Sequence, residues 1–448
     1  MRRILLPVFA GLFGLLLTTS CESEMPSMDS DPVEVNKWIF TTLKSNYLFW
    51  TAKDSASLNY GIQPPEFFGG LKSGSDNIAS LAKISDINSQ EYYDIGFEYG
   101  INNYRGDNVT YYVVYYTRKG TFAYDNIKRG DNIIAVNGTS VTEQNSKTLL
   151  AEAIAEGGTI TLSYMRPPQS EPIDIDFPVM SLSNPLVAKE DPVYAVTDTV
   201  MGSLRVGYIA YNRFSSDHET ELLNALTQLK SRNVNYLVLD LRYNAGGSLP
   251  VFQTLGSALV KNRTTGDPFL VYKRREDIGD RQISLSNVSS IPNLGDQLAK
   301  IYIITGQYTA SASEAFINAL KAYWGNNLIL VGEKTTAGDN NNIAIVPTAD
   351  KTNQWQLTVP IGYMADKDGN SNYANGFTPT GKYLVNDINP EEVEALRPLG
   401  VTSERIYKVI IDDIRGVRAL KSATITTDSY KIPSSIMSKP WANKAIAE

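Results

Sequence analysis

Residues 236–247 read YLVLDLRYNAGG, an apolar run that leads directly into a pair of glycines. The run Tyr236–Leu241 is typical of a strand that is buried on both faces, as in a parallel sheet. Strand-like and helical segments alternate on either side of it, which predicts a parallel α/β sheet with right-handed crossovers. The other predicted strands are 206–210, 301–304 and 328–331, and the predicted helices are 219–232 and 313–324.

Two segments follow strands of this sheet, at the carboxyl ends where such sheets bind ligands. In the first, 240–247, Gly246 and Gly247 allow a sharp turn and offer unobstructed N–H groups that suit an oxyanion hole. The second, 309–314 (TASASE), places Ser311 at a strand-to-helix elbow, where we expect it to be exposed and near the positive end of a helix. Each segment alone also fits a structural role, a tight turn or a helix cap.

A different pattern occupies residues 94–166, where strands dominate. Segments 110–116 and 133–136 are rich in β-branched and aromatic residues, and the second ends at an Asn-Gly turn before a short helix at 148–155. The stretch 127–138 is similar to the best-known segment of PDZ domains, which bind an extended peptide as an added strand. The alternative is a generic β-hairpin.

The chain begins with a targeting segment. Arg2 and Arg3 precede an apolar run from Ile4 to Leu17, followed by the lone cysteine, Cys21. The run is shorter than the about 20 residues of a spanning helix, and the pattern is that of a secretory signal peptide. It resembles a bacterial lipoprotein signal, in which Cys21 becomes the lipidated first residue. We therefore expect an exported lipoprotein, anchored to a membrane of the cell envelope on the periplasmic side or the cell surface.

Composition narrows the classes of function. The 448 residues include 42% hydrophobic and 20% charged side chains, which is typical of a globular protein. With 41 basic and 48 acidic residues the net charge is −7, and no Lys/Arg cluster stands out, so nucleic acid is not an expected partner. One cysteine excludes an internal disulfide and a Cys-based zinc site. Any Ser-His-Asp triad would have to use the single histidine, His218.

Together and in order, these segments resemble the carboxyl-terminal processing, or tail-specific, serine peptidases. Residues 331–335 (VGEKT) also fit that family, and Asp368-Gly369, Tyr373 and 376–379 fit its lipoprotein-anchored members from Bacteroidetes. The resemblance implies a multidomain α/β fold: a helical N-terminal domain, a PDZ-like β domain and a parallel-sheet peptidase core of the crotonase-like or ClpP-like type. The implied divisions are a signal peptide at 1–21, a tether at 22–31, the helical domain at 32–90, the PDZ-like domain at 91–166, a connector at 167–200, the core at 201–388 and an extension at 389–448 with a helix at 403–418.

The resemblance also implies roles for individual residues. Ser311 would be the nucleophile, and the backbone N–H groups of Gly247 and Ala312 would form the oxyanion hole. Gly246 and Glu314 match positions that shape the site. No metal or organic cofactor is implied, the expected partners are unfolded or C-terminal peptide segments of proteins, and the peptide-binding residues are not identified.

Two positions depart from the family. Active members have a general-base lysine where this chain has Asp339, or Gly338 if no insertion is allowed. The acidic residue that many members carry on the helix after the serine is Ala322 here. A lysine base requires burial that lowers its pKa from about 10.4 toward 7, whereas aspartate, with a reference pKa near 3.9, is a much weaker base. Loss of a general base typically lowers the rate by about 100- to 10,000-fold.

Three alternatives remain for the base: Lys334 turned inward, His218, or a rebuilt site that uses Asp339 and water. The expected function is a cell-envelope serine endopeptidase of the tail-specific family, which captures C-terminal peptides and cleaves them with Ser311. The competing hypothesis is a catalytically inactive, membrane-tethered peptide-binding relative.

Overall fold

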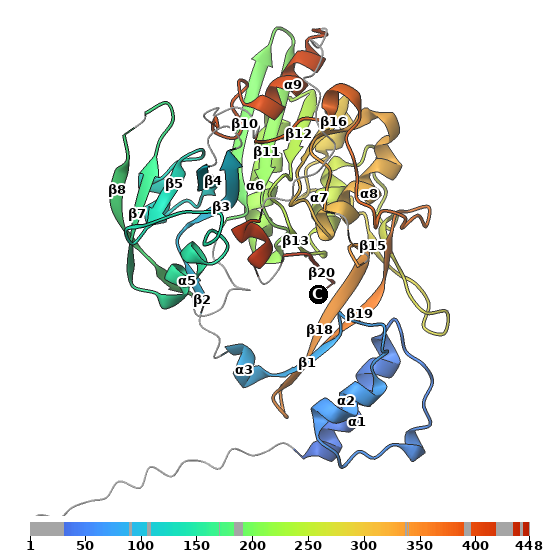
Figure 1. Cartoon of the computed structure of the whole chain (residues 1–448). Helices are drawn as coiled ribbons and strands as arrows, with labels where there is room; N and C mark the ends of the chain where they lie inside the picture. Colours follow the sequence, from blue (N-terminus) through green and yellow to red (C-terminus); the bar gives the residue numbers. More distant parts are fainter. Residues whose placement is uncertain are drawn as a thin grey trace, which may run out of the picture.

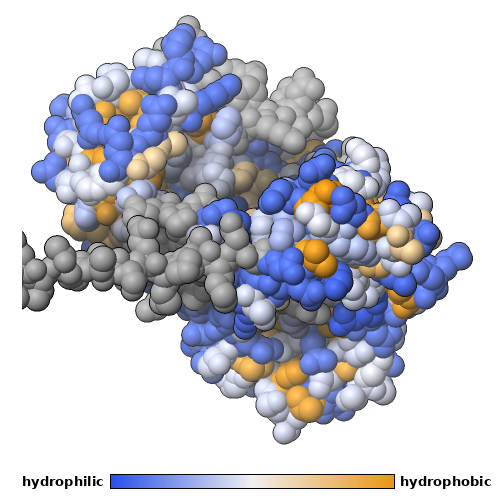
Figure 2. All heavy atoms as spheres, turned by 90° about the horizontal axis from the view of Figure 1, so that it is seen from below, coloured by the Kyte–Doolittle hydropathy of each residue, from blue (hydrophilic) through white to orange (hydrophobic). Residues whose placement is uncertain are grey.

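The computed structural model describes most of the chain from residue 31 onward. The described residues are 31–88, 92–104, 109–169, 171–182, 191–336, 338, 340–388, 396–417, 433–439 and 442–447. Cys21 and the predicted signal peptide therefore lie outside the described residues. Within the described part, no helix has the length and apolar character needed to cross a bilayer. On the face shown in Figure 2, hydrophobic residues form small separate groups among hydrophilic ones.

Helices α1 (Pro32–Asn46) and α2 (Pro64–Leu71) form the predicted helical segment near the N-terminus (Figure 1). The side chain of Asp31 caps α1 by accepting a hydrogen bond from the N–H group of Val33 at 3.0 Å. Buried residues of both helices belong to the same apolar cluster as the α/β core. Strand β1 (Ser80–Lys83) then pairs antiparallel with β19 (Trp355–Ala365), so this segment is joined to a core sheet.

An antiparallel sheet forms most of residues 92–182. Its order is β3-β4-β5-β7-β8 with β6 beside β5, and β2 pairs separately with β9. The predicted Asn137-Gly138 turn joins β5 to β6, with φ angles of 49° and 75° that these two residue types tolerate. The elements are β2 (Tyr92–Asp94), β3 (Phe97–Tyr104), β4 (Val109–Thr117), α4 (Phe122–Asn126), β5 (Asn132–Val136), β6 (Thr139–Ser140), α5 (Leu149–Glu156), β7 (Thr159–Met165), β8 (Ile173–Pro178) and β9 (Met180–Leu182).

The segment predicted as a connector, 167–200, contains three strands that belong to the neighbouring sheets. Strands β8 and β9 extend the antiparallel pairing, and β10 (Val193–Met201) is the edge strand of the core sheet. The alternation of Ile173, Ile175 and Phe177 with polar residues explains β8, because a half-buried strand has this period.

The core sheet has the order β10-β11-β12-β16-β17, and its strands from β11 to β17 run parallel. As predicted, the strand that contains Leu237, Val238 and Leu239 is fully buried on both faces. Leu237 and Leu239 belong to the larger apolar cluster, and Val238 belongs to a second cluster on the opposite face. The elements are β11 (Leu204–Tyr211), α6 (Glu219–Ser231), β12 (Tyr236–Asp240), α7 (Phe252–Leu259), β16 (Lys300–Thr305), α8 (Ala312–Trp324), β17 (Leu328–Gly332) and α9 (Arg405–Ile414).

A second sheet, which the sequence analysis does not predict, has the order β13-β20-β18-β19-β14-β15, with β1 on β19. It joins short strands that are far apart in the chain, including the last one. Its strands not yet given are β13 (Gly246–Ser248), β14 (Pro268–Lys273), β15 (Arg281–Ser284), β18 (Ile343–Asp350) and β20 (Lys444–Ile446). The short helices are η1 (Ser55–Ser57), α3 (Ile84–Asn88), η3 (Ser216–His218), η4 (Leu294–Gln297), η5 (Gly325–Asn327), η6 (Gly381–Tyr383) and η7 (Ser435–Ser438).

Candidate active site

Ser311 lies at the elbow between strand β16 and helix α8. Its φ of 54° and ψ of −106° are rare for a residue other than glycine, and such strain is concentrated at functional sites. The residue precedes Ala312, the first residue of α8, so it lies at the positive end of the helix dipole. The prediction that this serine is exposed is wrong: Ser311 is 1% exposed, because the glycine turn and strand β20 both pack against this helix.

The glycine turn is held next to this elbow by Asn244. The carbonyl oxygen of Asn244 accepts hydrogen bonds from the N–H group of Ala310 at 3.2 Å and from the hydroxyl of Ser313 at 2.8 Å. Its side-chain oxygen accepts a hydrogen bond from the N–H group of Gly246 at 3.0 Å. The structure thus brings together the two segments that the sequence separates by more than sixty residues.

The two glycines are required by backbone packing. Gly246 and Gly247 have φ angles of 118° and 129°, which side-chain-bearing residues rarely adopt. A Cβ atom on Gly246 would lie 3.4 Å from the carbonyl oxygen of Ala310, and one on Gly247 would lie 2.2 Å from that of Phe214. The turn can approach its neighbours this closely because it carries no side chains.

Glu314, in the first turn of α8, is a buried carboxyl that supports the elbow. Its Oε2 atom accepts hydrogen bonds from the N–H group of Ser311 at 3.0 Å and from the amide of Asn341 at 2.8 Å. Its Oε1 atom accepts one from the hydroxyl of Thr335 at 2.6 Å. Burial raises the pKa of Glu314 to about 8, although these hydrogen bonds act in the opposite direction. The carboxyl is therefore largely protonated at neutral pH.

Asn341 and Tyr373 complete the surroundings of Glu314. The amide of Asn341 also donates to the carbonyl oxygen of Thr336 at 2.6 Å, which ties the loop before β18 to the site. The ring of Tyr373 stacks on Phe377, and its buried hydroxyl has no hydrogen-bond partner within the part of the chain that the structure describes. Tyr373 was noted in the sequence for its fit to the family; Asn341 was missed, because one asparagine in an NNN run carries no distinguishing signal.

Neither of the two described candidates for a general base, Lys334 and His218, is hydrogen-bonded to Ser311. Asp339 lies outside the described residues. Lys334 is exposed, and its charge slightly lowers the pKa of Glu314. The ring of His218 contacts the hydroxyl of Ser215 at 3.1 Å. Among the described residues, no basic side chain is hydrogen-bonded to the Ser311 hydroxyl. Ala322, at the position of the expected acid, is a half-buried residue near the end of α8.

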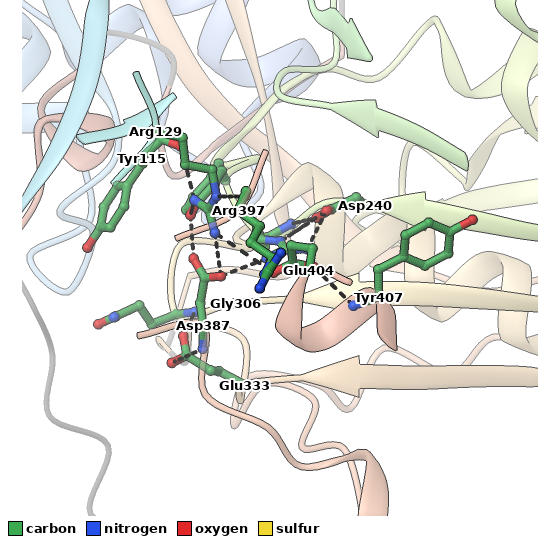
Figure 3. A network of polar contacts seen from close by, with 12 residues as sticks. Tyr115, Arg129, Asp240, Gly306, Glu333, Asp387, Arg397, Glu404 and Tyr407 are labelled. Carbon is green, nitrogen blue, oxygen red and sulfur yellow. Dashed lines mark hydrogen bonds and ion pairs between the residues drawn. The ribbon is translucent and has the colours of Figure 1, made fainter. Parts of the chain in front are cut away.

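A buried ion network anchors the chain at the start of the glycine turn (Figure 3). Arg242, 1% exposed, contacts Asp240 at the end of β12 and donates hydrogen bonds to Asp387 at 2.6 Å and to Glu404 at 2.8 Å. Arg129, from the antiparallel sheet, also donates to Asp387 at 2.8 Å. Burial alone would raise the pKa of Asp387, but the charges of Arg129 and Arg242 lower it to about 2.

The arrangement suits nucleophilic chemistry at a carbonyl group. A hydroxyl lies at the N-terminus of a helix, where the first N–H groups have no carbonyl partner within the helix. Beside it is a glycine turn whose backbone is unobstructed by side chains. Backbone N–H groups in such positions stabilise the negative charge that develops on a carbonyl oxygen under attack.

Comparison with known proteins gives one family. Residues 205–383 match the model of peptidase family S41. The carboxy-terminal processing protease CtpB of Bacillus subtilis is 26% identical over 255 residues, which cover 57% of this chain and 48% of that protein. The carboxyl-terminal-processing protease of a Picosynechococcus species is 28% identical over 211 residues, covering 47% of this chain and 46% of that protein. This chain thus spans about half the length of the curated relatives it matches.

A solved structure shares the fold over more of the chain. A protein from Bacteroides fragilis that is assigned to the S41 proteases superposes with a TM-score of 0.66. The match covers 85% of this chain and 98% of the other, at 23% sequence identity. The mixed α/β architecture with its parallel core sheet is therefore an architecture found in S41 protease structures.

Proposed function

We propose that this chain, whose residues 205–383 match the model of peptidase family S41, is a serine endopeptidase that cleaves unstructured C-terminal segments of proteins. Ser311 would attack the scissile carbonyl carbon, and the N–H groups of Gly247 and Ala312 would hold the oxyanion. The proton lost by the hydroxyl would pass to a base and then to the leaving amine. Water would hydrolyse the acyl-enzyme that remains.

One observation carries this proposal. Ser311 has a strained backbone, begins helix α8, and is tied through Asn244 to the glycine turn. A serine that served only to cap a helix would need neither the positive φ nor the glycine pair beside it. The combination supports a nucleophile with an adjacent site for negative charge.

Turnover of an unfolded protein with a free C-terminus tests the proposal. We expect the chain from Ser23 to Glu448 to cleave it, and Ser311→Ala to lose at least 1,000-fold in rate, since nucleophile and base act as a unit. A fluorophosphonate probe, which reacts with activated serines, should label the tryptic peptide that contains Ser311. Ser313→Ala is the matched control: it removes one of the two hydrogen bonds to the Asn244 carbonyl, so labelling should be slower in it but not lost. Equal turnover by Ser311→Ala and the parent chain would refute the assignment.

The base is proposed to come from the loop between β17 and β18. Lys334 is in this loop and its charge reaches Glu314, which supports it as the first residue to substitute. We expect Lys334→Met to lower turnover by about 100-fold or more if it is the base. If turnover is unchanged, Asp339 with water becomes the candidate, and Asp339→Asn should then lower the rate.

A second candidate function is peptide binding without cleavage. Asp339 stands at the position of the family lysine, and Lys334 is exposed, and these two observations favour it. In that case all variants cleave at background level, but Ser311→Ala and the parent chain bind an unfolded peptide equally. A gain of turnover in Asp339→Lys would indicate that the remaining catalytic groups are intact.

The antiparallel sheet at 92–182 is proposed as a PDZ-like module that captures the peptide. In support, a cavity of about 230 Å³ lies between strands β2 and β3 and helix α5, lined among others by Tyr92, Phe97 and Ile154. The proposal predicts that Ile154→Arg weakens capture of long substrates and leaves cleavage of short peptides unchanged. Equal loss for both substrate lengths would contradict it.

Export as a lipoprotein anchored through Cys21 is also proposed, on the basis of the N-terminal pattern alone. In bacteria that process lipoproteins, Cys21→Ser should move the protein from the membrane fraction to the soluble envelope fraction. Unchanged fractionation and unchanged mass of the N-terminal peptide would contradict the anchor.

A further inference from the structure

The last strand of the chain lies in the candidate active site. Strand β20 (Lys444–Ile446) runs parallel to β13, with Gly246 opposite Lys444, and it contacts β18 through Ile345 and Ile446. Figure 1 shows the C-terminus beside β20, close to β13 and β18. The glycine turn of the site therefore has the chain's own C-terminal segment as its neighbour in the sheet.

Backbone hydrogen bonds hold this strand in place. A segment bound in this way resembles an extended peptide added to a sheet, for which main-chain bonds supply affinity with little regard to sequence. On the β13 side, the N–H of Asn443 donates to the carbonyl oxygen of Ala245 at 2.7 Å, and the N–H of Leu249 donates to the carbonyl oxygen of Ile446 at 2.7 Å. On the β18 side, the N–H of Ala447 donates to the carbonyl oxygen of Ile345 at 2.9 Å.

Side chains anchor the strand weakly. Within β20, Ala445 is 1% exposed and belongs to the larger apolar cluster, Ile446 is half-buried, and Lys444 is exposed. One buried methyl group contributes about 1 kcal/mol. By contrast, β16 buries both Ile301 and Ile303 completely. With one fully buried alanine and one half-buried isoleucine, β20 buries less apolar surface than β16 does.

The strand also comes close to the nucleophile. A Cβ atom on Gly246 would lie 2.5 Å from the carbonyl oxygen of Lys444 and 3.4 Å from that of Ala310, the residue before Ser311. The carbonyl oxygen of Lys444, in the C-terminal strand, therefore lies close to Gly246. Gly246 also lies close to Ala310, in the elbow that carries Ser311. Helix α8 contacts both β13 and β20.

We propose that β20 is a displaceable occupant of the peptide-binding groove between β13 and β18. The tail blocks the groove until an extended peptide, with a small residue at the position of Ala445, replaces it as a strand. This inference rests on the proposed function, because it assigns the groove to that site's substrate. Since a tethered tail has an effective concentration on the order of millimolar, an added peptide of similar intrinsic affinity competes poorly with it.

Binding of the tail's own sequence, added as a separate peptide, tests the inference. The probe is fluorescein-labelled ANKAIAE, residues 442–448, and the protein is the chain from Ser23 to Glu448 with Ser311→Ala, so that no cleavage interferes. Ala445→Glu in the protein places a charge at the buried position and should release its tail. We expect fluorescence anisotropy to show at least tenfold tighter binding of the probe to the released variant than to its parent.

Two controls make the comparison specific. Asn443→Asp adds the same charge at an exposed residue two positions away and suits the positive φ of 55° there. This variant should bind the probe as weakly as the parent. A probe that carries Ala445→Glu should not bind the released variant. Equal affinity in parent and released variant, or no binding to either, would overturn the inference, since β20 would then be a permanent part of the sheet or the peptide would bind elsewhere.

If the Ala445→Glu variant does not fold, hydrogen exchange on the unsubstituted chain tests whether β20 is displaceable. We expect the amides of residues 443–447 to exchange within minutes and faster still with excess probe, while β12 stays protected for hours. Equal protection of β20 and β12 would overturn the inference. Neither measurement requires catalysis, and turnover by the chain with Ser311 is measured in a separate assay. A failure of the peptidase proposal can therefore be told apart from a failure of this inference.

Discussion

At the residue scale, Glu314 is a buried carboxyl whose surroundings favour its protonated form more than water does. It accepts hydrogen bonds from Ser311, Thr335 and Asn341 in an environment that raises its pKa to about 8. A charged carboxylate at this depth would be poorly solvated, and the protonated form keeps the elbow neutral.

This raised pKa predicts a pH dependence of stability. Because the folded state holds the proton of Glu314 up to about pH 8 and the unfolded state loses it near 4.5, the free energy of unfolding should fall as pH rises between these values. The change is on the order of a few kcal/mol. Urea unfolding at pH 5, 6.5 and 8 should show a flatter profile for Glu314→Gln than for the parent. Glu66→Gln, an exposed position, controls for charge removal, and a profile as steep as the parent's in Glu314→Gln would contradict the expectation.

At the element scale, strand β13 is a three-residue strand built on backbone contacts. Its glycines face Phe214 on one side and Lys444 on the other at distances that exclude a side chain. A short strand of this kind has no apolar side chains to hold its position. It is positioned instead by Asn244 and by the neighbouring backbone.

A Cβ atom on this strand should therefore disturb the site. Gly247→Ala adds a carbon 2.2 Å from the carbonyl oxygen of Phe214 at a φ of 129°, and we expect a loss of about 1–3 kcal/mol in unfolding free energy and of at least 100-fold in turnover. Gly279→Ala is the control, since its φ is 67° and no atom lies within 4 Å of the added carbon. Denaturant unfolding and turnover measured on both variants test this. Equal losses would indicate that strain, and not the contact with Phe214, limits the position.

At the scale of the whole molecule, the buried ion network joins three parts of the chain. Arg129 comes from the antiparallel sheet, Asp240 and Arg242 from the core sheet, and Asp387 and Glu404 from the C-terminal third. Figure 3 shows Arg129, Asp240, Asp387 and Glu404 converging from different elements. The network fixes where the glycine turn begins and how the antiparallel sheet meets the core.

Removal of one member should be costly, because it leaves buried charges without a partner. We expect Arg242→Met to lower the unfolding free energy by about 3–5 kcal/mol. Lys408→Met, which breaks an exposed ion pair with Asp412, should change it by less than about 1 kcal/mol. Guanidinium unfolding of both variants measures the difference. If Arg242→Met lowers the unfolding free energy no more than Lys408→Met does, the prediction that breaking the buried network is costly is wrong.

The sequence by itself determined the features that depend on residues close together in the chain. The apolar run at 236–241, the Asn137-Gly138 turn and the elbow at Ser311 follow from local propensity and periodicity, and the structure has each where predicted. The family, too, follows from short motifs whose order and residue types are local.

Only the tertiary structure decided which distant segments meet. The pairing of Gly246 with Lys444 joins residues about two hundred positions apart, and the short run KAI has no periodicity that predicts it. The burial of Ser311 and the raised pKa of Glu314 likewise come from neighbours contributed by β13, β20 and the loop at Asn341. Burial and strand pairing depend on contacts between remote parts of the chain, so they are established only when the chain folds.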